Sequence, residues 1–318
     1  MTLHRQEQST YLYMYSYRED ERLLCKLEMR AFFGRDTDSF IIESHEKINP
    51  SRSPFMKARL DKIYENQTLE GLTKQAEALQ MQGKTFKVLF VKQTNQRNEE
   101  QVEFSKRREI ERKVGSVIQG VVDLHNPELL LGIIKVKDKW ILGIYHKSKA
   151  IWLQHQSKPA QYSTALSTRV ARAIVNIAAP YPSGVKLIDP CCGIGTVLVE
   201  ALSMGINIVG RDLNPLVIPG ARENIAFFGL EGEVTLGDVR EVSGDYDVAI
   251  IDMPYNLCSV ITSQEKLEMI QNARRFSKKL VVVTIEPMDS VIMASGFEIV
   301  DRCVAKKGTF LREVLVCV

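Results

Sequence analysis

Short apolar segments alternate with polar ones through the first part of the chain. Some of these segments are rich in aromatic and β-branched side chains, and others space leucines at helical intervals. We predict strands at residues 10–17, 39–44, 55–65 and 84–93 and helices at residues 19–33 and 68–80. The order strand, helix, strand, strand, helix, strand is that of a ferredoxin-like fold, in which both helices cover one face of an antiparallel sheet. This pattern predicts an α+β segment over residues 1–83.

The next segment, residues 84–150, begins with the last of those strands and continues through a polar loop into a charged helix. That helix is predicted over residues 105–122, with Ile110 and Val114 on its apolar side. Two further strands, residues 129–136 and 140–146, are joined by a tight turn. Residues 151–163 show no clear period and are interpreted as a linker.

From residue 164 to residue 318, strands and helices alternate regularly. A helix is expected over residues 166–178, and the strands that follow are almost continuously apolar. The expected strands are residues 185–190, 207–212, 233–238, 247–254, 279–286 and 311–318. Strands of this kind, separated by helices, indicate a parallel sheet that is covered by helices on both faces. Residues 164–318 are therefore predicted to form one α/β domain.

Composition and charge narrow the class of protein. With 45% hydrophobic and 25% charged residues, the chain has the composition of a soluble globular protein, and we expect it in the cytoplasm. The net charge is +3, but residues 1–160 hold 27 Lys and Arg against 21 Asp and Glu, while the rest is net acidic. This excess favours the first half as the polyanion binder, and a merely solvated basic surface remains an equal alternative.

A glycine-containing turn between a predicted strand and helix carries the first chemical signal. In the sequence LIDPCCGIGT, glycines let the backbone pass close to a nucleoside-bearing ligand. The turn lacks the spacing that admits a pyrophosphate, and Asp189 stands just before it. A carboxylate there suits the cationic amino-acid end of S-adenosylmethionine. Alone, the turn would also fit a dinucleotide or no ligand at all.

Two more acidic strand ends strengthen that interpretation. Asp212 ends the second predicted strand and is placed to accept hydrogen bonds from ribose hydroxyls, and Asp238 follows the third strand and could accept from an adenine amino group. Ligands of open α/β sheets bind beyond the carboxyl ends of the strands, so three acids there outweigh the alternative of simple helix caps. The expected cofactor-binding residues are Asp189, Cys191, Gly193, Gly195, Thr196, Asp212, Leu213, Asn214, Asp238 and Val239.

The fourth predicted strand ends in Asp252-Met253-Pro254-Tyr255, which provides the candidate reaction. An exocyclic amine on a purine is a poor nucleophile, because its lone pair is delocalised into the ring. Asp252 and a backbone carbonyl at Met253 or Pro254 could accept its N–H bonds and direct the lone pair at a methyl group, while Tyr255 stacks on the base. The expected catalytic residues are thus Asp252, Pro254 and Tyr255, with no metal.

These motifs resemble a known family. Residues 161–318 are similar to amino-methylating class I methyltransferases, which carry an (Asp/Asn/Ser)-Pro-Pro-(Tyr/Phe/Trp) tetrad; Met253 replaces the first proline. Residues 84–147, with the segment VDLHNPE, resemble the THUMP module, a small RNA-binding domain. The chain as a whole resembles the THUMP-domain tRNA guanosine N2-methyltransferases, whose catalytic domain is of the UPF0020 type.

The resemblance implies a Rossmann-like class I methyltransferase domain preceded by a ferredoxin-like segment and a THUMP-like module. It also implies methyl transfer from S-adenosylmethionine to a guanosine N2 amine in RNA, with tRNA the favoured partner. From the residues themselves we expect no membrane partner, and no obligate protein partner is evident. Two alternatives stay open from the residues. One is an adenine N6-methyltransferase on RNA or DNA, and the other is a weakly catalytic RNA-binding protein, which Met253 would explain.

Overall fold

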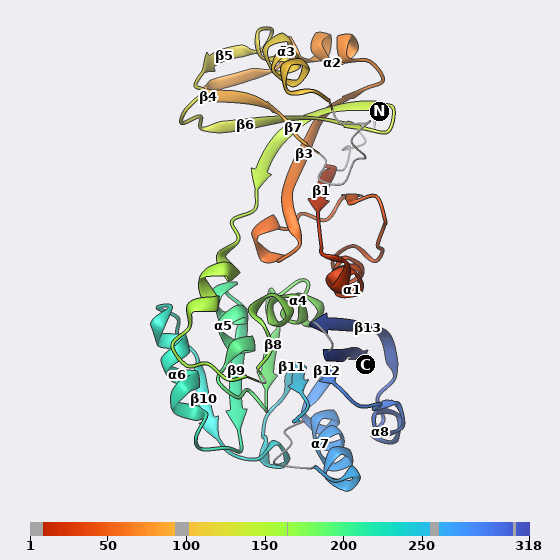
Figure 1. The fold of residues 1–318 in the computed structure, drawn as a ribbon, viewed down its shortest axis with the longest axis vertical. Helices are drawn as coiled ribbons and strands as arrows, with labels where there is room; N and C mark the ends of the chain where they lie inside the picture. The colour runs from red at the N-terminus through yellow and green to blue at the C-terminus, as the bar shows by residue number, and fades with distance from the viewer. Residues whose placement is uncertain (1–8, 93–101, 164, 255–260, 308–309) are drawn as a thin grey trace, which may run out of the picture. The chain divides into compact units, whose positions relative to one another are not determined.

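The computed structural model describes residues 9–92, 102–163, 165–254, 261–307 and 310–318 (Figure 1). These residues form two compact units. Unit 1 contains the described residues up to Ser16, together with Thr37–Ser51 and Phe55–Lys149. Unit 2 contains Tyr17–Asp36, Arg52–Pro54 and Ala150–Val318. Neither unit is continuous in sequence, because two short segments from the first part of the chain pack within unit 2.

Unit 1 is built on one seven-stranded sheet with the order β2-β1-β3-β7-β6-β4-β5. Its strands are β1 (Tyr11–Tyr15), β2 (Ile41–Ser44), β3 (Met56–Asn66), β4 (Gln80–Phe90), β5 (Gln119–Val122), β6 (Leu129–Val136) and β7 (Lys139–Lys147). The helices α2 (Leu69–Ala76) and α3 (Phe104–Gly115) share a single apolar core with the sheet, so both cover the same face. β4 runs parallel to both of its neighbours, and the other pairs are antiparallel.

Unit 1 contains the predicted elements with two main departures. In addition, the helix predicted over residues 68–80 ends at Ala76, β4 begins at Gln80, and the sheet is not wholly antiparallel. The helix predicted over residues 105–122 ends at Gly115, and Gln119–Val122 forms the edge strand β5 beside β4. A Cβ on Gly120 would lie 2.7 Å from the Met81 side chain, so β5 can approach β4 closely only with glycine at that position. The second departure is α1 (Arg22–Phe33), which was expected on this sheet but packs in unit 2.

Unit 2 has a second seven-stranded sheet, with the order β10-β9-β8-β11-β12-β14-β13. Its strands are β8 (Lys186–Asp189), β9 (Asn207–Asp212), β10 (Glu233–Leu236), β11 (Tyr246–Asp252), β12 (Ser277–Thr284), β13 (Ile299–Lys307) and β14 (Phe310–Cys317). The first five run parallel, and β14 enters antiparallel between β12 and β13. All six strands predicted after residue 164 are confirmed; β13 was missed. This is the Rossmann-like arrangement that the sequence predicted.

Helices cover both faces of this sheet. The helices of unit 2 are α1, α4 (Thr168–Ala178), α5 (Thr196–Ser203), α6 (Ile218–Phe227), α7 (Ser263–Phe276) and α8 (Asp289–Ala294). α7 and α8 share an apolar core with alternate residues of β11 and β12, such as Ile251 and Val282. α4 also contacts these strands but contributes nothing to that core, so it lies on the opposite face. Within the described ranges, no helix is long and apolar enough to cross a membrane.

A buried network of hydrogen bonds holds residues 17–36 and 52–54 against α4. The Glu28 carboxylate accepts hydrogen bonds from Ser53 Oγ at 2.5 Å and from Asn176 Nδ2 at 2.7 Å, and all three residues are buried. Arg172 on α4 donates from Nε to the Arg52 carbonyl at 2.7 Å. Because buried polar groups must be satisfied, these contacts specify where α1 and residues 52–54 pack.

The same network extends to the segment before α4. Arg172 Nη1 donates to Glu200 Oε2 at 2.8 Å, and His155 Nδ1 lies 2.7 Å from Glu200 Oε1. His155 belongs to the short 3-10 helix Ile151–Ser157 and is buried against Phe228. Part of the predicted linker is therefore an anchored element of unit 2.

Glu28 should make the stability of unit 2 dependent on pH. Burial raises the pKa of the Glu28 carboxyl to about 7, whereas a glutamate in an unfolded chain titrates near 4.3. The folded state therefore holds the proton more tightly than the unfolded state. The free energy of unfolding should fall by roughly 3 kcal/mol as pH rises from about 4.5 through 7. Urea unfolding followed by circular dichroism at pH 5 and pH 8 measures this difference.

Glu28→Gln should remove most of this pH dependence and be the more stable protein at pH 8. The exposed Glu19, in the same segment, provides the control, because Glu19→Gln should keep the wild-type dependence. Equal pH dependence in wild type and Glu28→Gln would contradict this account.

Candidate active site

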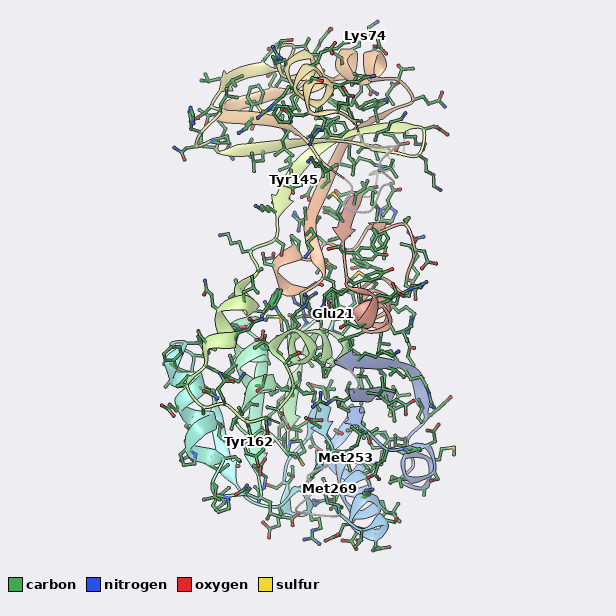
Figure 2. The ribbon with its side chains drawn as sticks, viewed as in Figure 1. Glu21, Lys74, Tyr145, Tyr162, Met253 and Met269 are labelled. Atoms are coloured by element: carbon green, nitrogen blue, oxygen red, sulfur yellow. The ribbon has the colours of Figure 1, made fainter. Side chains whose placement is uncertain are left out.

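A cavity of about 620 Å³ opens where the parallel strands of unit 2 end. β8, β9 and β11 finish at Asp189, Asp212 and Asp252, and all three line the cavity, as does Asp238 just after β10. Figure 2 labels three other lining residues, Tyr162, Met253 and Met269. The predicted residues brought together here are Asp189, Cys191, Gly193, Thr196, Asp212, Leu213, Asn214, Asp238, Val239, Asp252 and Pro254. Two predicted residues are not among the lining: Gly195 lies at the start of α5, and Tyr255 lies outside the described residues.

The glycine turn after β8 is held by a carboxylate from β9. Asp212 Oδ2 accepts a hydrogen bond from the Gly193 N–H at 2.7 Å, and Oδ1 accepts from the Asn214 N–H at 2.8 Å. Gly193 and Gly195 have φ angles of 53° and 75°, in the left-handed region that glycine adopts without strain. Asp212 thus shapes the turn as well as facing the cavity.

The start of α5 offers unused hydrogen-bonding groups to the cavity. Gly195 is the N-cap residue and has no side chain to cap the first turn, so the helix N-terminus is left uncapped. Thr196 lines the cavity, and its Oγ1 is buried without a hydrogen-bond partner among the described residues. A buried hydroxyl without a partner is uncommon in proteins and indicates that a ligand supplies one.

Acidic side chains dominate the lining. Asp189, Asp212, Asp238, Asp252, Glu265 and Glu268 face the cavity together with one described cation, Arg240. Burial raises the pKa of the Asp189 carboxyl well above its usual range, and the charges of Asp212 and Asp252 raise it further. Such a site favours a cationic occupant, because a nearby positive charge relieves the repulsion among these carboxylates.

Cys191 and Cys192 do not supply a nucleophile to this site. Burial raises the pKa of both thiols far above neutrality, with the Asp189 charge adding to the effect. The reactive form of cysteine is the thiolate, so both side chains act as small apolar groups here. Across the described residues, no group of three His, Cys, Asp or Glu is placed to hold a metal ion.

Asp238 is already paired, which the sequence did not reveal. Its carboxylate caps a short 3-10 helix by accepting from the Arg240 N–H at 2.8 Å, and Arg240 Nη2 donates to Oδ2 at 2.6 Å. The guanidinium lowers the pKa of Asp238, so this carboxylate stays charged. Arg240 also reaches Glu268 at 3.3 Å, which connects the β10 end to α7.

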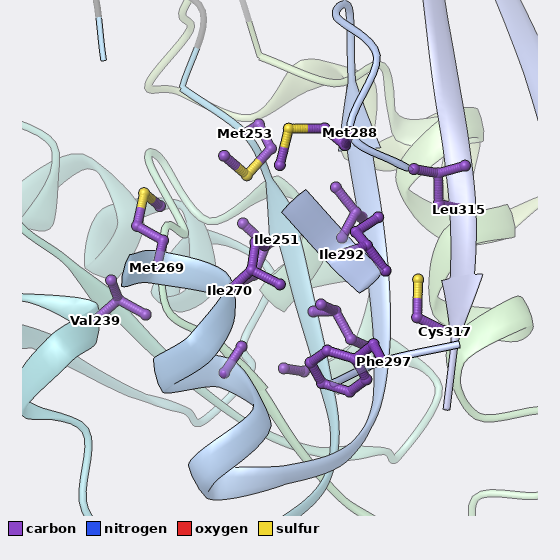
Figure 3. Close-up of a cluster of buried hydrophobic side chains, with 14 of the residues drawn as sticks. Val239, Ile251, Met253, Met269, Ile270, Met288, Ile292, Phe297, Leu315 and Cys317 are labelled. Atoms are coloured by element: carbon purple, nitrogen blue, oxygen red, sulfur yellow. The ribbon is translucent and has the colours of Figure 1, made fainter. Parts of the chain in front are cut away.

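Met253 forms part of both the core and the cavity wall. Its side chain is 3% exposed and packs with Met269 and Met288 in the cluster drawn in Figure 3. Its backbone N–H donates to the Val283 carbonyl at 2.8 Å, which extends the pairing of β11 with β12 by one residue. A proline at this position could not make that hydrogen bond. The departure from the double-proline tetrad therefore has a local structural use.

Several lining residues escaped the sequence analysis. They come from segments with no strand-end position to mark them: Tyr162, Arg240, Glu265, Glu268 and Met269. Tyr162 stands in the predicted linker, and Glu265 was recognisable only as part of the capping box with Thr262 at the start of α7.

Met253→Pro should destabilise unit 2 by about 2–4 kcal/mol, because it leaves the Val283 carbonyl unpaired and opens space in the core. Met253→Leu, which keeps the N–H and most of the volume, should cost less than about 1.5 kcal/mol. Urea unfolding midpoints measure both effects. A proline variant as stable as wild type would contradict the importance of this hydrogen bond.

Comparison with known proteins agrees with this geometry. Residues 155–309 match the UPF0020 family model, described as "RMKL-like, methyltransferase domain". This part of the chain is therefore similar to methyltransferase domains of that type. A tRNA (guanine(10)-N2)-dimethyltransferase of Methanothermobacter thermautotrophicus is 32% identical over 174 residues, which is 51% of this chain and 51% of that protein.

A second relative is the human U6 snRNA (guanine-N(2))-methyltransferase THUMPD2, which is 28% identical over 142 residues, 42% of this chain and 27% of that protein. The matched region thus spans about half or less of these two relatives. Among solved structures, TrmN from Thermus thermophilus is similar with a TM-score of 0.48 and 17% identity, covering 97% of this chain and 99% of that one.

Proposed function

We propose that this chain is an S-adenosylmethionine-dependent RNA methyltransferase that methylates the exocyclic N2 amine of a guanosine, with tRNA as the substrate class. The observation that carries the proposal is the acidic cavity at the carboxyl edge of β8, β9 and β11, with the Asp252-Met253-Pro254 segment in its wall. This cavity lies within the part of the chain that matches a methyltransferase family, and the two relatives described above are named as guanine-N2 methyltransferases of tRNA and of U6 snRNA.

The cavity residues fit the parts of S-adenosylmethionine. The uncapped start of α5, the Thr196 hydroxyl and Asp189 suit its amino-acid end, which carries both an ammonium and a carboxylate group. Asp212 would accept from the ribose hydroxyls, and Asp238 with the Val239 N–H would meet the adenine. The remaining predicted contacts are Cys191, Gly193, Gly195, Leu213 and Asn214. When bound, S-adenosylmethionine would supply an activated methyl group for transfer.

Asp252 and its neighbours would position the target amine. The Asp252 carboxylate and a carbonyl of Met253 or Pro254 accept the two N–H bonds of the amine, which turns its lone pair toward the methyl group. Asp252 would also receive the proton that the amine loses after transfer. Tyr255 keeps its predicted role as the stacking platform for the base. The residues therefore act mainly by positioning and by excluding water.

The other parts of the proposal are the partner and the location. Unit 1 contains the basic helix α3 and the THUMP-like segment. We propose that this unit binds structured RNA by recognising the shape of the RNA and the charge of its phosphates. We further propose a cytoplasmic enzyme that needs no obligate protein partner. Support for the location comes from the cysteines of the described residues, which are free thiols at Cys25, Cys191, Cys192, Cys303 and Cys317.

Asp252→Ala should lower methyl transfer about 100-fold or more while leaving cofactor binding within a few-fold, because it removes the acceptor that orients the amine. Transfer of isotopically labelled methyl groups to RNA, followed by nucleoside analysis, measures the first effect, and calorimetry measures the second. Asp245→Ala, at an exposed aspartate just before β11, is the matched control and should keep full activity.

The nucleoside analysis also decides among the alternatives. Label in N2-methylguanosine supports the proposal, and label in N6-methyladenosine identifies the protein as an adenine N6-methyltransferase. RNA binding without label identifies a protein that has kept the fold for handling RNA. Full activity in Asp252→Ala would refute the assigned mechanism.

Cofactor affinity should rise with pH because of Asp189. Because burial raises its pKa, the Asp189 carboxyl keeps its proton to a higher pH than an ordinary aspartate, and a cationic ligand favours the ionised form. Affinity should therefore increase with pH, by up to about tenfold per unit below that pKa. Calorimetry between pH 5.5 and 7.5 measures this, and buffers of different ionisation enthalpy reveal the released proton. Asp189→Asn should bind more weakly and without this pH dependence. A flat profile in the wild type would contradict the prediction.

A further inference from the structure

A second cavity, of about 310 Å³, lies within unit 1 and has no part in the proposed methyl transfer. Its walls come from β4, β6 and the first turns of α3, and they are formed by Lys87, Leu89, Phe104, Arg107, Arg108, Glu111 and Leu130. The volume is within the range of pockets that bind small organic groups. The chemistry of the wall combines an aromatic ring with three cations.

Phe104, the first residue of α3, is the aromatic part of this wall. Its side chain is 65% exposed, and the guanidinium groups of Arg107 and Arg108 lie 5.5 Å and 5.3 Å from its ring centroid. These distances are those of cation–π contacts. Since Arg107 and Arg108 follow Phe104 by three and four residues, the helix itself places both next to the ring. All three side chains end in flat groups and line the cavity, and we refer to them together as a layer.

The charges around this layer are mostly uncompensated. Among the described residues, Glu111 is the only acid in the wall, and its two oxygens accept from the Phe90 N–H at 2.8 Å and from Arg108 at 3.0 Å. Lys87 Nζ donates to the Leu124 carbonyl and has no acidic partner among the described residues. The Arg107 side chain has neither an ion pair nor a hydrogen bond within the described part of the chain, and its Nε is buried. The wall therefore has an excess of positive charge, which favours the binding of an anion.

We propose that this cavity binds one unpaired nucleotide of the RNA substrate. The base stacks on the layer of Phe104 and the two guanidinium groups, and the phosphate lies against Arg107 and Lys87. Flat guanidinium and aromatic groups stack bases that are free of pairing, and basic side chains next to them hold the backbone. An acidic peptide would satisfy the charge but would leave the exposed ring unused. The inference rests on the proposed function only in taking RNA as the substrate.

Fluorescence anisotropy with the full-length protein and no cofactor tests the base and the phosphate separately. One probe is a labelled eight-nucleotide oligouridine, and the other is an abasic oligomer with the same number of phosphates. Phe104→Ala should weaken oligouridine binding by about 5- to 100-fold and leave abasic binding unchanged, and Phe104→Tyr should restore it. Arg107→Gln should weaken both probes and reduce the slope of log affinity against log salt by about 0.7.

Phe227→Ala is the matched control, because Phe227 on α6 is also an exposed phenylalanine, with 58% of its side chain accessible. It should bind both probes as the wild type does. Phe104→Ala with unchanged oligouridine affinity would overturn the inference. So would oligoglutamate that displaces oligouridine equally well from the wild type and from Phe104→Ala, since the site would then bind acidic polymers in general.

The outcome separates this inference from the proposed function. A wild-type protein that methylates RNA but binds oligouridine no better than the abasic probe refutes the stacking site alone. A wild-type protein that binds neither probe refutes the stacking site. If that protein also fails to methylate RNA, the proposal that RNA is the substrate is refuted as well.

Discussion

The hydrogen bond between the Gly193 N–H and the Asp212 carboxylate is the contact on which the candidate active site depends. The bond is 2.7 Å long and joins the turn after β8 to the end of β9, and both residues line the 620 Å³ cavity. The turn can take this form because Gly193 and Gly195 have positive φ angles, and the same turn starts α5 with an uncapped N-terminus beside Thr196. Parallel strands then bring Asp189 and Asp252 to the same edge.

Concentrating carboxylates at one sheet edge has an electrostatic consequence. Burial, together with repulsion from Asp212 and Asp252, raises the pKa of Asp189, and the site favours a cationic ligand. The charge pattern is reversed in the second cavity of unit 1, where Lys87, Arg107 and Arg108 face one already occupied carboxylate. Each unit thus carries a cavity whose charge is opposite to that of the ligand proposed for it.

The buried network around Glu28, Ser53 and Asn176 shows how unit 2 depends on distant parts of the chain. Residues 17–36 and 52–54 belong to this unit although more than a hundred residues separate them from α4. Their polar groups are satisfied by Asn176 and Arg172, so the α4 surface that they cover is not suited to face water alone. The methyltransferase-like unit is for this reason larger than the segment with the alternating strand pattern.

The sequence by itself determined most of the strands, the type of sheet in unit 2 and most of the cavity. Apolar strands are local signals, and the carboxyl ends of parallel strands meet by geometry, so Asp189, Asp212, Asp238 and Asp252 could be placed together in advance. Only the tertiary structure decided the rest. α1 has an ordinary amphipathic pattern that fits either sheet, and the partners of Glu28 that select unit 2 lie far away in sequence. β5 and β13 form because β4 and β14 offer them edges. The fold alone brings three further residues to the cavity: Tyr162, Arg240 and Glu268. The residue type at Met253 is explained by the hydrogen bond from its backbone N–H to the Val283 carbonyl on the neighbouring strand. Neither feature could be predicted, because long-range packing leaves no pattern in the local sequence.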